Sequence, residues 1–481
     1  MLFSEPIFLF FFLPLLLAVH ALAPSPLRNA VLAGASILFY AWDTPEHVWI
    51  LLGSITFNYL IGFGVAAKVS RFRRSILFLG IAGNLAVLGF FKYANFAVAN
   101  LNILWTGAGN PPLEVAPAPL PLGISFFTFQ CISYIADVYR GGKPCQRNPV
   151  DMALYVALFP QLIAGPIVRY HEIASQIRER LCSLPQFKAG MARFIVGLVK
   201  KVLIADTLAR PADLCFSLTS SELTAPLAWC GLVCYTLQIY FDFSGYSDMA
   251  IGLGRMFGFR LPENFNFPYI ATSVTDFWRR WHLTLSNWFR DYVYVSLGGN
   301  RISPNRTYVN LGIVFLLCGL WHGASWTFIM WGMFHGAMLV LERILGPMNQ
   351  LPQWLTRIIT LFAVMIGWVL FRSESFDAAG VYLTTMFGAG TAMESRVLLR
   401  ALLSNEIIIV VIIAVVAATP VSALLRRFLA DWLHRAKAGI GRRTRLIRIH
   451  RATDLALCGL ILILMLRVAD QNYVPFLYFR F

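Results

Sequence analysis

The sequence predicts an all-α protein that crosses a membrane many times, as one integral-membrane domain over residues 1–481. Hydrophobic residues make up 58% of the chain and charged residues only 13%, whereas a soluble domain carries roughly 25% charged residues. The net charge is +16 at pH 7, but the basic residues fall in short loops between apolar runs, which is the positive-inside pattern of membrane proteins. We therefore expect a lipid bilayer around the chain and no nucleic-acid partner.

The apolar segments predict about eleven transmembrane helices together with re-entrant and interfacial helices. A helix needs about 20 residues to span a bilayer, and several of the segments are shorter than this or broken. The longest one has room for two elements. The apolar segments lie near residues 5–22, 30–42, 48–67, 75–94, 119–137, 151–167, 190–208, 225–257, 308–341, 355–371, 406–425 and 452–469.

Loop charge predicts how the chain is oriented in the membrane. The segment 68–74 has four basic residues and no acid, so we expect it in the cytoplasm, whereas the polar and nearly uncharged segment 95–118 is expected outside. The strongly basic loop 426–451 is also expected in the cytoplasm. Counting spans from these loops, with a last helix at 452–469, places both termini on the outer side.

A histidine lies in the middle of the longest uncharged stretch of the chain. Residues 307–341 contain no Asp, Glu, Lys or Arg, and Trp321-His322-Gly323 lies near their centre. An ionisable side chain at membrane depth is costly, and its default interpretation is a functional site. Because Gly319 and Gly323 flank the histidine, we expect the backbone to open around it.

Four roles are compatible with His322: a metal ligand, a proton relay, a polar core residue bonded to a backbone carbonyl, or a general base. A metal site is not expected, because His335 is 13 residues further on and no carboxylate lies near either histidine. A general base fits best, because imidazole titrates near neutral pH and can remove the proton of an attacking hydroxyl.

Two carboxylates lie in the apolar segment 225–257. Asp242 and Asp248 are six residues apart, so they would point about 240° apart on an unbroken helix, whereas a break at Gly245 would bring them to one cavity. Alternatively, each carboxylate pairs with an arginine to hold a polar core together, because a buried carboxylate needs a partner. The candidate arginines are Arg255, Arg279 and Arg280.

The polar stretch 255–306 has apolar residues every three to four positions from Asp276 onward. This pattern predicts a helix along the membrane surface, with aromatic rings toward lipid and the guanidinium groups of Arg279 and Arg280 toward headgroups or phosphate. It fits either a membrane anchor or a binding site for an acyl donor. His282 favours the second interpretation slightly, since anchoring needs no imidazole.

The apolar segment 159–166 contains Pro160, Gly165 and Pro166. Two prolines stop a straight helix. Non-helical backbone at membrane depth is tolerated only where protein buries it or where it lines a cavity. We therefore expect this segment beside the central pathway of the protein.

Nine short motifs lie along the chain: FKYANF at 91–96, PLGISF at 121–126, SYIADVYRG at 133–141, FPQLIAGP at 159–166, YFDFSGYSDMA at 240–250, ENFN at 263–266, FWRRWH at 277–282, SLGGNR at 296–301 and GLWHG at 319–323. None is specific alone. Jointly they resemble the membrane-bound O-acyltransferase family, and within it the bacterial branch that serves alginate O-acetylation. The resemblance covers about residues 1–372, with a motif-bearing core at about 90–345.

The resemblance implies a ring of tilted helices around a central tunnel that is open to both sides and thinnest at the catalytic histidine. His322 matches that histidine, and His282 matches a second polar position that many members carry as Asn, Asp or His. Other tunnel or structural polar residues are expected at Asp242, Asp248, Asn266, Trp321 and His335.

The resemblance also implies an O-acyltransferase in a bacterial inner membrane. With the orientation that loop charge predicts, both termini then lie in the periplasm. Acetyl-CoA is the expected donor, entering from the cytoplasm near Arg279 and Arg280, with no bound cofactor and no metal. A periplasmic SGNH-like acetyltransferase would complete transfer to a polysaccharide such as alginate. Two other classes stay open: a transporter or flippase whose His and Asp residues relay protons, and an inactive scaffold that recruits the periplasmic enzyme.

Overall fold

The computed structural model describes residues 1–42, 44–67, 71–346, 351–388 and 394–421, together with Gly459, Leu464 and Arg467. Every element within these residues is a helix, which confirms the predicted all-α class. Apart from the three single residues, the basic loop expected at 426–451, the last helix expected at 452–469 and the C-terminus lie outside the described residues.

Most of the helices follow one another with short connections, and the longer connections are residues 108–123, 257–273 and 290–303. In chain order they are α1 (Leu13–Leu22), α2 (Arg28–Ala41), α3 (Val48–Ala66), α4 (Arg73–Gly107), α5 (Ile124–Arg140), α6 (Pro149–Ala157), α7 (Phe159–Leu162), α8 (Tyr170–Arg178), α9 (Leu184–Val199), α10 (Asp206–Ser217), α11 (Ala225–Met256), α12 (Val274–Trp278), α13 (Leu283–Phe289), α14 (Pro304–His322), α15 (Trp326–Leu345), α16 (Gln353–Arg372), α17 (Phe376–Met386), α18 (Glu394–Leu402) and α19 (Asn405–Ala417).

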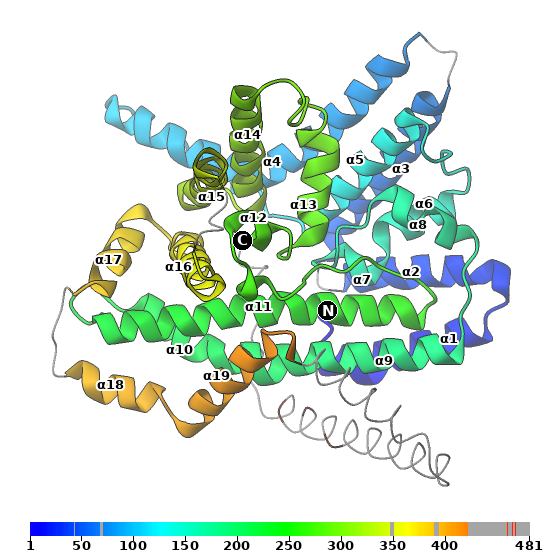
Figure 1. Ribbon diagram of the computed structural model, residues 1–481. Coiled ribbons are helices and arrows are strands. Elements are labelled where there is room, and N and C mark those ends of the chain that lie inside the picture. Colours follow the sequence, from blue (N-terminus) through cyan, green and yellow to red (C-terminus); the bar gives the residue numbers. More distant parts are fainter. Residues whose placement is uncertain are drawn as a thin grey trace, which may run out of the picture.

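The long helix α11 lies at the centre of the molecule. It packs along α9 and α10, which are joined by a π-helical turn at Lys200–Ala205. Figure 1 shows α9, α10 and α19 on one side of α11, and the group α12 to α15 on the other. Nearly every residue of α11 after Cys230 is buried, as expected for a helix that is apolar all round.

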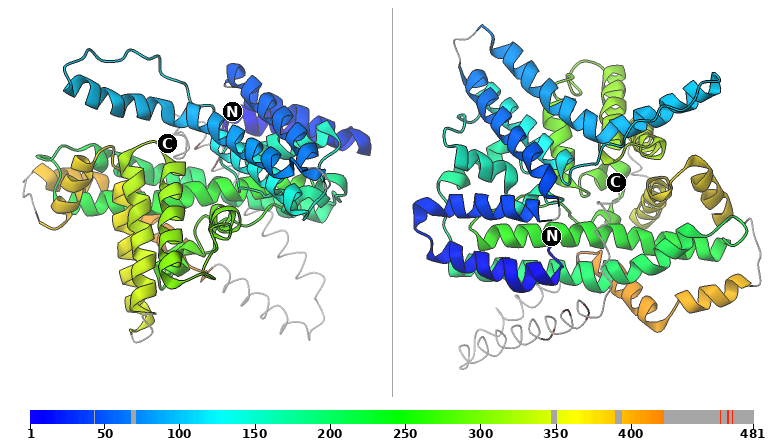
Figure 2. Two further views of the ribbon diagram at one scale, coloured as in Figure 1. Left: turned by 90° about the horizontal axis from the view of Figure 1, so that it is seen from above. Right: turned by 180° about the vertical axis from the view of Figure 1, so that it is seen from behind.

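Four helices in the described part of the chain are long and apolar enough to cross a membrane: Pro45–Ala66, Arg73–Gly107, Trp326–Leu345 and Gln353–Arg372. The expected number of about eleven spans, and their closure into a ring, stay predictions. The 35 residues of α4 extend about 52 Å, well beyond a hydrocarbon core of about 30 Å. Its C-terminal end projects beyond the other helices, and the loop that follows runs back along it (Figure 2).

The prediction of a helix along the membrane surface within residues 255–306 is wrong. The chain forms two short helices, α12 and α13, and the aromatic side chains of this region are buried inside the protein, including Phe277, Trp281 and Trp288. The chain reverses between the two helices at His282, whose φ of 43° lies in the left-handed region. An aromatic, amphipathic pattern cannot distinguish lipid from the protein interior, because both are apolar.

The break predicted within 159–166 is confirmed. The helix α7 has only four residues, and the chain from Ile163 to Arg169 is non-helical and buried. At Gly165 a Cβ atom would lie 2.3 Å from the carbonyl oxygen of Pro160, so only glycine fits this tight loop. Ile163 lines a small cavity beside His322.

Candidate functional site

His322 is the last residue of α14 and is buried. The helix runs unbroken through Gly319, so the expectation that the backbone opens on both sides of the histidine is wrong. A Cβ atom at Gly319 would lie 2.4 Å from the carbonyl oxygen of Phe328, which shows that this glycine allows α14 and α15 to approach closely. The chain becomes extended only after the histidine, at Gly323.

Two side chains of α4 bind the carbonyl groups at the end of α14. Lys92 Nζ donates to the carbonyl oxygens of Trp321 and, at 3.2 Å, of His322. The Tyr93 hydroxyl donates to the carbonyl oxygen of Leu320 at 2.8 Å. A cation at the C-terminal end of a helix satisfies exposed carbonyls and complements the helix dipole. These contacts therefore fix the turn that carries the histidine.

Lys92 and Tyr93 were not among the expected site residues. The FKYANF motif contained both of them, but their contacts lie more than 220 residues away in sequence. A usable signal was present nonetheless: Lys92 is the only charged residue in the apolar segment 75–94. By the same reasoning that applies to His322, a lysine at membrane depth marks a functional or structural site.

His282 and His322 lie close together, although they are forty residues apart in sequence. Their ring centroids are separated by 6.5 Å. His282 is 0% exposed and occupies the reversal between α12 and α13. Its Nδ1 atom is 3.0 Å from Oδ1 of Asn264. Like Lys92 and Tyr93, Asn264 lies in one of the short motifs but was not among the expected site residues, whereas Asn266, two residues further on, was expected.

Aromatic rings enclose the two histidines. The ring centroid of Trp321 is 5.9 Å from the ring centroid of His282 and 5.0 Å from that of His322. Trp331 and Phe371 lie edge-on to His322 at 5.0 and 5.2 Å. Such a wall excludes water and strengthens electrostatic interactions inside the site. Trp321 is therefore part of the wall around the histidines.

Asn266 and His335 lie outside this histidine pair. The backbone N–H of Asn266 donates to the carbonyl oxygen of Arg280 at 2.9 Å, which ties the chain after α11 to the α12–α13 reversal. His335 is buried on α15 and accepts a hydrogen bond at Nδ1 from Trp278 Nε1 at 3.3 Å. Among the described residues no group of three or more His, Cys, Asp and Glu side chains is placed to hold a metal ion.

The two carboxylates of α11 belong to separate ion-pair networks. The helix is unbroken at Gly245, so the break that would have brought Asp242 and Asp248 together is absent from α11. The prediction that Arg255, Arg279 or Arg280 pairs with these carboxylates is also wrong. The basic side chains that contact Asp242 and Asp248 come from α9 and from the π-helical turn. The ion pairs are Asp242 with Lys201 at 2.7 Å, Asp206 with Lys201 at 2.7 Å, Asp248 with Arg193 at 2.6 Å and Asp248 with Lys200 at 2.7 Å.

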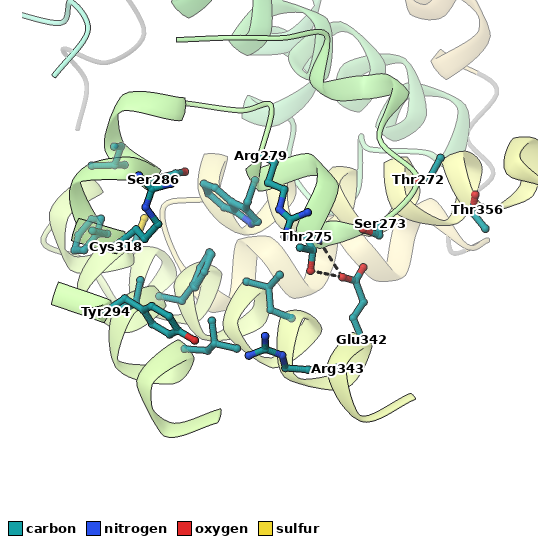
Figure 3. A pocket seen from close by; sticks show the side chains of 18 of the residues that line it. Thr272, Ser273, Thr275, Arg279, Ser286, Tyr294, Cys318, Glu342, Arg343 and Thr356 are labelled. Atoms are coloured by element: carbon teal, nitrogen blue, oxygen red, sulfur yellow. Dashed lines mark hydrogen bonds between the residues drawn. The ribbon is translucent and has the colours of Figure 1, made fainter. Parts of the chain in front are cut away.

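A cavity of about 860 Å³ lies between α12, α13, α14 and α15 (Figure 3). Three arginines line it, Arg279, Arg290 and Arg343. Its lining also includes Cys318, one turn before His322 on α14. Most of the remaining lining is apolar or carries hydroxyl groups. The cavity therefore combines cationic groups with a largely apolar path toward the end of α14.

Two other polar residues near this cavity are engaged in hydrogen bonds. Glu342 accepts from the Thr275 hydroxyl at 2.7 Å and from the Thr275 backbone N–H at 3.0 Å, as Figure 3 shows for this pair. Arg280 Nε donates to Asp276 at 2.8 Å. Of the two arginines expected on the donor side, the structure thus places Arg279 in the cavity lining and pairs Arg280 with a neighbouring carboxylate.

A second cavity, of about 160 Å³, lies at the end of α14. Its lining includes Lys92, Ser125, Trp321 and His322. The large cavity borders α14 from Leu311 to Cys318, and the small one begins at Trp321. His322 therefore lines the small cavity, and the large cavity ends about one turn before it on α14.

Comparison with known proteins agrees with the residue motifs. The sequence profile of the membrane-bound O-acyltransferase family matches residues 142–372. The chain is 44% identical to "Probable alginate O-acetylase AlgI" of Azotobacter vinelandii, over the full length of both. It is 50% identical to the protein of that name from Pseudomonas aeruginosa, over 81% of this chain and 76% of the other. It is also 39% identical to the peptidoglycan O-acetyltransferase of Helicobacter pylori, over 81% and 80%.

Proposed function

The chain belongs to the membrane-bound O-acyltransferase family and is an integral-membrane O-acyltransferase, and from this premise we propose that it passes acetyl groups across a bacterial inner membrane. The donor is acetyl-CoA in the cytoplasm. The final acceptor is an extracytoplasmic polysaccharide of the alginate type, reached through a periplasmic SGNH-like acetyltransferase. The observation that carries the proposal is the pair His282 and His322, of which His322 lines the small cavity, while the large cavity ends about one turn earlier on α14.

The large cavity is the site that we assign to the donor. Arginine guanidinium groups bind phosphate oxygens well, often in a bidentate manner, and Arg279, Arg290 and Arg343 all line this cavity. The cavity borders the middle of α14 and the end of α15. Trp326, at the start of α15, donates to Asn100 of α4 at 2.8 Å, within the segment expected outside, so we assign the opposite end of α15, with this cavity, to the cytoplasmic side. An acyl thioester would lie along the apolar wall toward Cys318, with its phosphates at the arginines.

The small cavity is the site that we assign to the attacking hydroxyl. His322 removes the proton of this hydroxyl as its oxygen attacks the thioester carbonyl. The new C–O bond forms, the tetrahedral intermediate collapses, the C–S bond breaks and the CoA thiolate leaves. The proton held by His322 then passes to the thiolate. His282 orients the reacting groups beside it, since correct placement contributes as much to such reactions as proton transfer does.

The proposal is tested with purified protein in liposomes. Acetyl-labelled CoA is supplied on the cytoplasmic face and an alginate oligosaccharide, with the periplasmic acetyltransferase, on the other. We expect label on the oligosaccharide only when donor, protein and partner are all present. Movement of an unmodified substrate without any donor would favour the transporter class. Absence of label from both protein and acceptor at saturating donor would contradict the proposed reaction.

Removal of two cavity arginines should weaken donor binding. For the double variant Arg279→Gln/Arg343→Gln we expect KM for acetyl-CoA to rise about 100-fold or more, because each of the two charge-assisted hydrogen bonds to phosphate is worth roughly 1.5–3 kcal/mol. The value of kcat should change little. The matched control is Arg306→Gln, an exposed arginine at the start of α14. Equal KM values for the double variant and the control would remove the donor assignment.

Replacement of Lys92 should impair catalysis through the position of His322. Lys92→Met keeps the length of the side chain but removes the donor to the carbonyls of Trp321 and His322. We expect kcat to fall about tenfold, equivalent to about 1.4 kcal/mol, with an unchanged KM for acetyl-CoA. Initial rates of label transfer measure both constants. A matched Lys143→Met change, on a lysine of the loop after α5, should leave kcat unaltered.

A further inference from the structure

Asn264 joins four groups at the centre of the histidine site. It is 1% exposed. Its Oδ1 atom lies 3.2 Å from the backbone N of Thr284, 2.9 Å from the Thr284 hydroxyl and 3.0 Å from Nδ1 of His282. Its Nδ2 atom donates to the Ser247 hydroxyl on α11 at 3.1 Å. One side chain therefore connects α11 to the α12–α13 reversal.

These contacts decide which ring nitrogen of His282 carries the proton. The backbone N–H of Thr284 can only donate, so the amide atom that faces it must be the oxygen of Asn264. The Thr284 hydroxyl accepts from the backbone N–H of Ile167 at 3.0 Å and is thereby free to donate to the same oxygen. An unprotonated Nδ1 would direct a lone pair at this oxygen across 3.0 Å. The neutral ring therefore has its proton on Nδ1.

The backbone around Asn264 holds the same turn. Leu283 N–H donates to the carbonyl oxygen of Asn264 at 3.0 Å, and Asn266 N–H donates to that of Arg280 at 2.9 Å. These bonds bracket His282, whose backbone is left-handed with φ of 43°. A non-glycine residue in that region is strained and persists only when its surroundings enforce it.

We propose that Asn264 is a positioning residue that holds His282 in the Nδ1–H tautomer, so that Nε2, on the opposite edge of the ring, is a proton acceptor. Within the proposed acyl transfer, on which this role depends, His282 accepts a hydrogen bond from the attacking hydroxyl or from His322. Neutral His282 then does not donate to the oxyanion, and the donor for that charge has to come from another group.

The tautomer is measured directly by magic-angle-spinning NMR of the full chain in lipid, with 15N- and 13C-labelled histidine. The protein has eight histidines, and the His282 signals are those lost in His282→Gln. We expect the protonated nitrogen to correlate with Cγ, as Nδ1 does. A protonated nitrogen that correlates only with Cδ2 and Cε1, as Nε2 does, would overturn the proposal. This measurement does not depend on acyl transfer, so the proposed function can fail while the tautomer assignment holds.

Two substitutions test the positioning role. Asn264→Asp keeps an oxygen for the His282 and Thr284 donors, so we expect the Nδ1–H signal and at least a third of wild-type kcat. Asn264→Leu removes the acceptor, and we expect loss of the Nδ1–H signal with a ten- to hundredfold lower kcat at an unchanged KM for acetyl-CoA. If Asn264→Leu retained both the tautomer and the rate, Asn264 would have no positioning role.

Asn310→Leu is the matched control for a general loss of packing. Asn310 is a fully buried asparagine of α14 whose Nδ2 donates to the carbonyl oxygens of Leu297 and Gly299. We expect this variant to lower the melting temperature while the His282 nitrogen signals stay in place. A tautomer change of the same size in Asn310→Leu would show that any buried cavity disturbs the ring, and would overturn the specific role of Asn264.

Discussion

Replacement of His322 by alanine is expected to reduce kcat for acetyl transfer by about 10²- to 10⁴-fold, the usual contribution of a general base. The KM for acetyl-CoA should change far less, because the cavity that we assign to the donor ends one turn earlier on α14, at Cys318. The measurement is the initial rate of label transfer by purified protein in liposomes. A full wild-type rate in purified His322→Ala would show that the proposed mechanism is wrong.

His335→Gln is the control for this substitution. Both histidines are buried, and both lie against Trp331, at centroid distances of 5.0 and 5.1 Å. His335 accepts a hydrogen bond from Trp278, so its replacement should lower the melting temperature. We expect kcat to fall less than tenfold. Equal losses in the two variants would point to a shared packing role and not to a base at His322.

The class of fold and the break within 159–166 were predictable from local features of the sequence. Mean hydropathy and low charge indicate a membrane protein, and two prolines within eight residues indicate a break. Both expectations depend only on neighbours in sequence. The joint presence of His282 and His322 in one site was also anticipated, through the family motifs and not through spacing alone. The roles of these two residues stay predictions.

The contacts between distant elements were not predictable in the same way. Asp248 pairs with Arg193 and Lys200, which lie 55 and 48 residues earlier in the sequence. Their approach depends on the packing of α9 and the π-helical turn against α11, and many arginines in the chain are equally compatible with the sequence. The prediction of a surface helix was wrong for a different reason, because lipid and the protein interior present the same apolar surroundings to an aromatic ring.

Removal of the Lys201 side-chain charge should cause the largest loss of stability. The Lys201 side chain is 4% exposed and contacts Asp206 and Asp242, both at 2.7 Å. Lys201→Met leaves these buried carboxylates without this cation, and breaking a buried ion pair in this way costs about 3–5 kcal/mol. The measurement is the free energy of unfolding by denaturant titration in mixed micelles. Adding Asp206→Asn should recover part of the loss, because one of the two carboxylates is then neutral.

The neighbouring Lys200 gives the matched control, because it contacts Asp248 at the same distance of 2.7 Å but is 23% exposed. Lys200→Met leaves Asp248 paired with Arg193 at 2.6 Å, so we expect a loss of less than about 1 kcal/mol. Both variants remove one positive charge from the same turn, but only Lys201 is buried. A difference in the free energy of unfolding between the two variants therefore reports the effect of burying the ion pair and not the effect of the charge alone. Equal losses would mean that the overall charge of this turn, and not the buried ion pair of Lys201, stabilises the packing of α10 against α11.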